Sequence, residues 1–86
     1  MALFDLLGRR WAMRVIWELR DGPMTFRELQ SACGGISSSV LAQRLAELRE
    51  AGIAAEGNTL TDDGRDLLTA YEPLNDWAKR WARRRG

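Results

Sequence analysis

Two short helices joined by a pair of glycines constrain this chain more than any other feature. The first helix is predicted at residues 25–32, where Thr25 and Glu28 have the spacing of a capping box. The adjacent glycines at 34–35 supply the turn that leads to the second helix. This layout is typical of a helix-turn-helix, which we place at residues 25–52.

The second helix of the motif opens on a run of serines, of which Ser37 is the expected N-cap. Leucines at positions 41, 45 and 48 recur on its buried side, and Gly52 ends it as a C′ glycine. Its exposed first turns carry side chains that are small or form hydrogen bonds: Ser38, Ser39, Ala42 and Gln43. Such side chains suit a surface that enters a DNA groove. Similar helix pairs also occur in domains that never contact DNA, so the flanking segments have to be weighed.

The length and the apolar content of the chain point to one small domain with a partner. A chain of 86 residues makes a single domain, residues 1–86, and buries only about 60–65% of its unfolded surface. Yet 45% of the residues are apolar and four are Trp, which is rich for so small a domain. We therefore expect part of the apolar surface to contact a second copy of the chain.

Several classes of function are excluded by residues that the sequence lacks. It has no His and a single cysteine, Cys33, so it offers no metal-ligand cluster and no intrachain disulfide, which fits a reducing cytosol. It shows no nucleophile beside a base and no glycine-rich phosphate loop, so we expect neither an enzyme nor a cofactor. No apolar run approaches the roughly 20 residues of a membrane span and no targeting segment is evident, which predicts a cytoplasmic protein without membrane contact.

The charge of the chain is unevenly distributed. Its net charge is only +1, but five of the 13 basic residues lie in the last eight positions. Residues 1–78 therefore carry 8 basic and 12 acidic groups, which argues mildly against strong non-specific DNA binding. DNA binding would require either that the basic tail lies near the phosphates or that arginines gather on one face. The candidates for such a face are Arg9, Arg10, Arg14, Arg27 and Arg44.

Two helical segments are predicted before the motif, at residues 2–7 and 9–19. The second segment is apolar over most of its circumference, and its narrow polar stripe contains Arg14 and Glu18, which can pair. A helix of this kind is expected to pack against both its own domain and a neighbour.

A minimal β-hairpin is predicted directly after the motif, at residues 53–61. Gly57 and Asn58 between two short extended runs are typical of a two-residue turn of type II′. A hairpin at this place is the wing of a winged helix, although this one contains no Lys or Arg. The predicted fold class is therefore mainly α with a small β-hairpin wing, a winged helix-turn-helix.

A long last helix is predicted at residues 62–84, capped by Thr61. Pro73 falls inside it and should kink it or divide it in two. The apolar residues of this helix share one stripe, with Trp77 beside it: Leu67, Tyr71, Leu74, Ala78 and Trp81. The stripe extends beyond the domain's own core, and a dimer seam is its simplest use.

Four segments in this order resemble the HxlR-type winged helix regulators, relatives of the MarR group. They are LFDLLGRRW at 3–11, GPMTFRELQ at 22–30, GISSSVLAQRLAELREAGI at 35–53 and LTDDGRDLL at 60–68. The resemblance implies a prokaryotic, homodimeric transcriptional regulator that binds double-stranded DNA in a sequence-specific way. Its two copies would read half-sites about 34 Å apart, one helical turn of DNA.

The resemblance also implies two sets of site residues. The second helix of the motif would lie in the major groove and other basic residues would reach phosphates, which gives the DNA-binding set Ser37, Ser38, Ser39, Gln43, Arg44, Arg9, Arg10 and Arg27. The N- and C-terminal helices would form the dimer, through Leu3, Phe4, Trp11, Tyr71, Leu74, Trp77 and Trp81.

Individual residues also have structural interpretations. Ser37 can act as an N-cap alone, and Gln43 can read an adenine edge or simply be solvated. Arg44 can contact phosphate or pair with Glu47. Cys33 fits a small buried residue better than a redox sensor, although a sensor role stays open. A cavity between the aromatic residues could hold a small apolar effector.

An alternative function is a protein-interaction module that keeps the winged fold but has little DNA affinity. The acidic body, the wing without basic residues and the serines at 38–39, where the family often has a basic pair, favour this alternative. Steep salt dependence of duplex binding separates the two functions, because phosphate neutralisation releases counterions.

Overall fold

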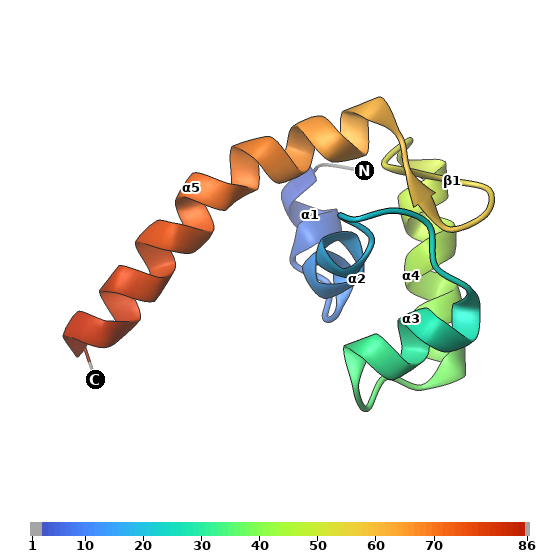
Figure 1. Cartoon of the computed structure of the whole chain (residues 1–86), viewed down its shortest axis with the longest axis horizontal. Helices are drawn as coiled ribbons and strands as arrows, with labels where there is room; N and C mark the ends of the chain where they lie inside the picture. Colours follow the sequence, from blue (N-terminus) through green and yellow to red (C-terminus); the bar gives the residue numbers. More distant parts are fainter. Residues whose placement is uncertain (1–2, 86) are drawn as a thin grey trace.

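The computed structural model describes residues 3–85, and side chains from residue 5 onward. It is mostly helical, with one antiparallel hairpin, which confirms the predicted fold class. The elements are α1 (Leu3–Leu7), α2 (Ala12–Glu18), α3 (Phe26–Cys33), α4 (Ser38–Glu50), β1 (Ala54–Ala55), β2 (Thr59–Leu60) and α5 (Asp62–Arg85). Helices α1 to α4 and the hairpin form a body, from which α5 extends far to one side (Figure 1).

The helix-turn-helix forms as the local sequence signals indicate. The backbone N–H of Glu28 donates to Thr25 Oγ1 at 3.1 Å, and the backbone N–H of Thr25 donates to Glu28 Oε1 at 2.9 Å, so both halves of the capping box are present. Gly34 and Gly35 turn the chain with φ of +58° and +92°, in the region that favours glycine. Ser37 Oγ accepts the backbone N–H of Val40 at 3.2 Å, which confirms it as the N-cap of α4.

Helix α2 is shorter than the predicted segment 9–19. Trp11 has a left-handed backbone with φ of +78°, so residues 9–11 form a turn and the helix begins at Ala12. The indole of Trp11 is half-buried against the core, which accounts for a large side chain at this unusual backbone position. Arg9 and Arg10 thereby lie in a turn, where sequence periodicity had placed them on a helix.

The core lies between α2, α3 and α4 and is closed by the hairpin and the start of α5. Its largest fully buried side chains are Leu6, Val15, Ile16, Leu19, Leu29, Leu41 and Leu48. Trp17 packs half-buried against this cluster, as does Trp11, which agrees with a packing role for both.

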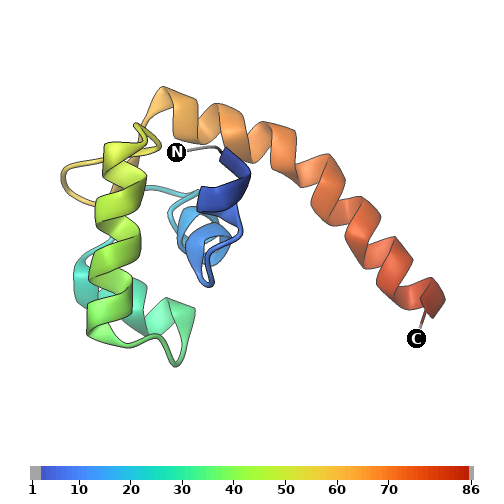
Figure 2. The same ribbon diagram turned by 180° about the vertical axis from the view of Figure 1, so that it is seen from behind.

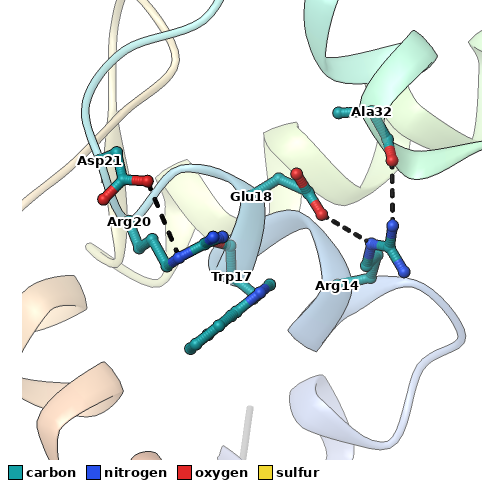
Figure 3. Close-up of polar contacts among 6 residues, drawn as sticks. All are labelled: Arg14, Trp17, Glu18, Arg20, Asp21 and Ala32. Carbon is teal, nitrogen blue, oxygen red and sulfur yellow. Dashed lines mark hydrogen bonds and ion pairs between the residues drawn. The ribbon is translucent and has the colours of Figure 1, made fainter.

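Polar contacts at the ends of α2 fasten it to its neighbours (Figure 3). The guanidinium of Arg14 donates to Glu18 Oε2 at 2.9 Å, as the spacing predicted, and also to the carbonyl of Ala32 at 3.0 Å. The second bond ties α2 to the last turn of α3. Arg20 lies over the ring of Trp17, 4.2 Å from its centroid, and donates to the Trp17 carbonyl. The Arg14 bond thus links α2 to the first helix of the helix-turn-helix, whereas the Arg20 contacts are local to the end of α2.

The hairpin has a three-residue loop rather than the predicted two-residue turn. Ala55 pairs with Thr59, which leaves residues 56–58 in the loop. Gly57 and Asn58 both have positive φ, +84° and +54°, whereas a type II′ turn has positive φ only at its first central residue. The side-chain amide of Asn58 donates to the Met24 carbonyl at 3.1 Å. This long-range bond holds the loop against the segment before α3.

Helix α5 is continuous from Asp62 to Arg85 and passes through Pro73, so of the two effects predicted for Pro73, a kink or a division of the helix, the division does not occur. Its ribbon bends along its length, as both views show (Figure 2). Thr61 Oγ1 accepts the backbone N–H of Gly64 at 3.1 Å, which confirms Thr61 as the cap. No helix within residues 3–85 has the length and apolar content needed to cross a membrane.

Candidate nucleic-acid interface

The first two turns of α4 present a free, well-supported face. Ser38, Ser39, Ala42 and Gln43 are all exposed there. On the opposite side Leu41, Leu45 and Leu48 are at most 2% exposed and anchor the helix in the core. Because buried leucines fix the helix, the exposed polar side chains have a defined placement. This is the arrangement that insertion into a groove requires.

Ser37 lies at the edge of this face, and its hydroxyl is engaged locally. It accepts from the backbone of Val40 and lies 3.4 Å from the hydroxyl of Ser39. The cap bond uses an acceptor lone pair and leaves the hydroxyl proton free to be donated. Ser37 therefore has a structural role as the N-cap of α4, whereas Ser38 and Ser39 have no capping role.

Arg44 is held in an internal network behind this face. Its Nε donates to the Arg10 carbonyl at 2.9 Å, and its Nη1 pairs with Glu47 Oε1 at 2.9 Å. Only 13% of the Arg44 side chain is exposed. The structure thus places Arg44 in the pair with Glu47, the alternative to a phosphate contact. The network joins α4 to the turn before α2.

The other basic candidates are more open. Arg9 Nε lies 3.3 Å from Glu47 Oε2, and 43% of its side chain is exposed. Arg10 is exposed, with its guanidinium 5.6 Å from the ring centroid of Trp11. Arg27 is exposed in the first turn of α3. Within residues 5–85 neither Arg10 nor Arg27 forms an ion pair, so both are available to an anionic partner.

Sequence reasoning missed the cluster of Arg9, Arg44 and Glu47. The spacing of Arg44 and Glu47 signalled one half of it, but Arg9 lies 38 residues away from Glu47. No local signal reports such a contact. The wing adds no positive charge, since its tip carries Glu56 with 97% of the side chain exposed, 4.0 Å from Arg49.

The predicted dimer residues whose side chains are described fall into two groups. Leu74, Trp77 and Trp81 on α5 are exposed by 59%, 49% and 47%. Trp77 and Trp81 stack with centroids 6.2 Å apart and ring planes 10° apart. Trp11 and Tyr71 are half-buried within their own chain. The side chains of Leu3 and Phe4 lie outside the described residues.

A cavity of about 590 Å³ opens between α1, α4 and the start of α5. Its floor is apolar and four carboxylates line it: Leu6, Ala51, Ile53, Leu67 and Ala70 with Glu47, Glu50, Asp63 and Asp66. None of the tryptophans lines this cavity, although Trp17 borders a separate hollow of about 380 Å³ beside Arg65 and Glu72. The cavity of about 590 Å³ is thus a different place from the possible effector cavity between the aromatic residues.

Cys33 is buried at the end of α3, with 3% of the residue exposed, and no disulfide partner exists in the sequence. Burial raises the pKa of the Cys33 thiol above its ordinary value, and the nearby charge of Glu18 raises it further. Both the burial and the raised pKa favour the packing role of Cys33 over a redox sensor.

Comparison with known proteins places these features in a family. The model of the HxlR-like helix-turn-helix family matches residues 6–85. The HTH-type transcriptional regulator YodB of Bacillus subtilis is 34% identical over 85 residues, which cover 87% of this chain and 76% of YodB. The uncharacterized regulator YvaP of the same organism is 29% identical over 87 residues, which cover 90% of this chain and 81% of YvaP.

Solved structures agree with this placement. The crystal structure of quinone-bound YodB matches with a TM-score of 0.83 and 36% identity, over 90% of this chain and 91% of that chain. A possible HxlR family transcriptional factor from Thermoplasma volcanium matches with a TM-score of 0.81 and 26% identity, over 96% of this chain and 84% of that chain. The chain therefore belongs to the HxlR family of helix-turn-helix transcriptional regulators.

Proposed function

We propose that this regulator binds double-stranded DNA in a sequence-specific way and acts as a homodimer in the cytoplasm. The observation that carries the proposal is the exposed face of Ser38, Ser39 and Gln43 on a helix whose other side is anchored by buried leucines. Gln43 is the base reader, since its amide can form a bidentate pair with an adenine edge. Arg10 and Arg27 contact phosphates, as free cations on the exposed surface.

The homodimer is supported by the outer half of α5. Leu74, Trp77 and Trp81 are large apolar side chains with about half of each exposed, and the body of the chain does not cover them. Exposed apolar patches of this kind mark interaction sites. A two-fold symmetric pair also matches the symmetry of a DNA site with two half-sites.

The competing function is a winged-helix protein-interaction module with little DNA affinity. The internal pairing of Arg44 and the acidic tip of the wing favour this alternative, because both reduce the positive charge available to phosphates. Neither function involves an enzymatic activity or a cofactor.

A small apolar effector belongs to the proposal as well. It is supported by the relative YodB, whose crystal structure with 36% identity to this chain is quinone-bound. A thermal shift of the dimer with a panel of quinones tests it, and the absence of any shift at millimolar concentration would remove the effector from the proposal.

The deciding experiment is fluorescence anisotropy with a labelled duplex from the DNA upstream of the gene, beside a scrambled duplex, at two salt concentrations. We expect tighter binding to the upstream duplex and a loss of affinity with salt, because bound arginines release counterions. No binding to either duplex at low salt would favour the interaction module.

A further inference from the structure

A continuous row of residues on one side of α5 connects the cavity with the exposed tryptophans. Its residues recur at alternating spacings of four and three: Asp63, Leu67, Ala70, Leu74, Trp77 and Trp81. Residues at these spacings share one side of a helix, which we call the outer stripe. The first three line the cavity and the last three are the exposed apolar residues. Gly64 and Leu68, which are buried against the body, lie on a neighbouring side.

Acidic residues predominate in the first turns of α5 and basic residues in its last two turns, although Arg65 lies among the former and Glu72 and Asp76 lie between the two ends. Its first turns carry Asp62, Asp63 and Asp66, and Glu50 adds a further carboxylate at the cavity rim. Its last two turns carry Lys79, Arg80, Arg83, Arg84 and Arg85. Within residues 5–85 no ion pair involves Glu50, Asp63, Asp66 or any of these five cations. The helix thus offers an acidic end, an apolar middle and a basic end along one stripe.

We propose that the outer stripe of α5 packs antiparallel on the same stripe of a second copy, about a two-fold axis at Leu74, so that Trp81 of each copy fills the cavity of the other. A two-fold contact must be self-complementary, and this stripe is, because its acidic end then meets the partner's basic end. Leu67 and Trp81 each lie seven residues from Leu74, on opposite sides of it, and therefore face one another. Asp63 and Arg85 each lie eleven residues from Leu74, again on opposite sides, so Asp63 of one copy meets Arg85 of the other.

The cavity has the chemistry to receive this occupant. Leu6, Ile53 and Leu67 give it an apolar floor for an indole, and the rim carboxylates can accept the indole N–H. The guanidinium of Arg85 lies 6.0 Å from the ring centroid of Trp81, so a cation enters together with the ring and meets Asp63 or Asp66. The inference rests on the proposed homodimer and adds its register, its partner surface and the use of the cavity.

Cross-linking of the full chain tests this register. Leu74→Cys places one thiol on the axis, and mild oxidation should join two copies, because residues on the axis face each other within disulfide reach. Glu72→Cys is the matched control, since Glu72 is exposed on the opposite side of the same helix and should give no covalent dimer. Wild type controls for Cys33, which is buried. A covalent dimer from Glu72→Cys and none from Leu74→Cys would overturn the proposal.

Charge reversal tests the paired ends independently of cross-linking. Asp63→Arg and Arg85→Asp should each raise the dimer dissociation constant about tenfold, because two opposite-charge contacts per dimer become like-charge contacts. The double variant restores both contacts and should return to within about threefold of wild type. Additive losses in the double variant would overturn the proposed pairing.

Failure of this inference is distinguishable from failure of the proposed function. A chain that sediments as a monomer yet binds the upstream duplex with steep salt dependence would overturn the α5 pairing and leave DNA binding in place. A Leu74 cross-link in a chain that binds no duplex would support the pairing and remove DNA binding.

Discussion

Gly64 marks a close approach of α5 to Ile53, the residue before β1, and replacing it with alanine should disturb that contact. Gly64 is buried and has an ordinary helical backbone, so glycine is not needed here to permit a left-handed backbone conformation. A Cβ atom built at this position would overlap the carbonyl oxygen of Ile53. That oxygen also accepts the backbone N–H of Thr61 at 3.0 Å. It cannot move away without breaking this hydrogen bond, which links the residue before β1 to the residue before α5.

Two opposing effects set the size of the change in Gly64→Ala. Alanine favours a helix over glycine by about 1 kcal/mol, which would stabilise the protein. Forcing an atom against the backbone typically costs about 1–3 kcal/mol or more, and the fixed carbonyl places this site at or above the upper end of that range. We expect a net loss of about 2 kcal/mol, or a fall in Tm of about 8–16 °C for a domain of this size.

Urea unfolding followed by tryptophan fluorescence and by helical circular dichroism measures this loss. Protein concentration has to be the same for all variants, since dimer formation adds to the apparent stability. Arg65→Ala and Arg65→Gly are the control pair, because Arg65 is exposed beside Gly64 and their difference isolates helix propensity. A Gly64→Ala protein as stable as wild type, or more stable, would refute the close approach of α5 to Ile53.

Three further predictions concern the motif and its support. The capping bonds with Thr25 hold the pKa of Glu28 below its ordinary value of about 4.5, so the stability that they supply is present above that value and is lost as pH falls through the lowered pKa. Thr25→Ala should cost about 1 kcal/mol at pH 7 and should reduce this acid sensitivity, as measured by thermal unfolding from pH 7 to pH 3. Glu47→Gln should cost about 1–2 kcal/mol, because the largely buried Arg44 keeps a hydrogen-bond acceptor but loses its counter-charge; an unchanged urea midpoint would show that the pair is solvated. Gln43→Ala should leave stability within about 0.5 kcal/mol of wild type and relax preference at one base position of each half-site; equal losses on cognate and scrambled duplexes would exclude base reading by Gln43.

Features set by neighbours in sequence could be predicted, whereas features set by distant contacts could not. The capping box at Thr25 and the cap at Ser37 depend on side chains three residues from their partners, so local spacing reveals them. The loop at Gly57 and Asn58 was predicted one residue too short, because its shape depends on a bond from Asn58 to Met24, 34 residues away. The left-handed backbone of Trp11 likewise depends on how its ring packs in the core.

The candidate site followed the same division. The exposed face of α4 could be derived from the period of its leucines, which fixes which side of the helix is buried. The internal engagement of Arg44 could not, because its Nε bond goes to the carbonyl of Arg10, 34 residues earlier. The mixed lining of the cavity escaped prediction as well, since it is assembled from α1, α4 and α5.

The bond from Asn58 to Met24 limits how much of a duplex each copy could read. This bond fastens the hairpin loop to the body, and α4 is the element of the proposed interface that presents side chains for reading bases. One short helix end addresses only a few base pairs, and each mismatch costs roughly 1–3 kcal/mol. Selectivity within a genome would then come from the fixed distance between two short half-sites. Inserting a few base pairs between the half-sites should therefore weaken binding as much as mutating the half-sites themselves.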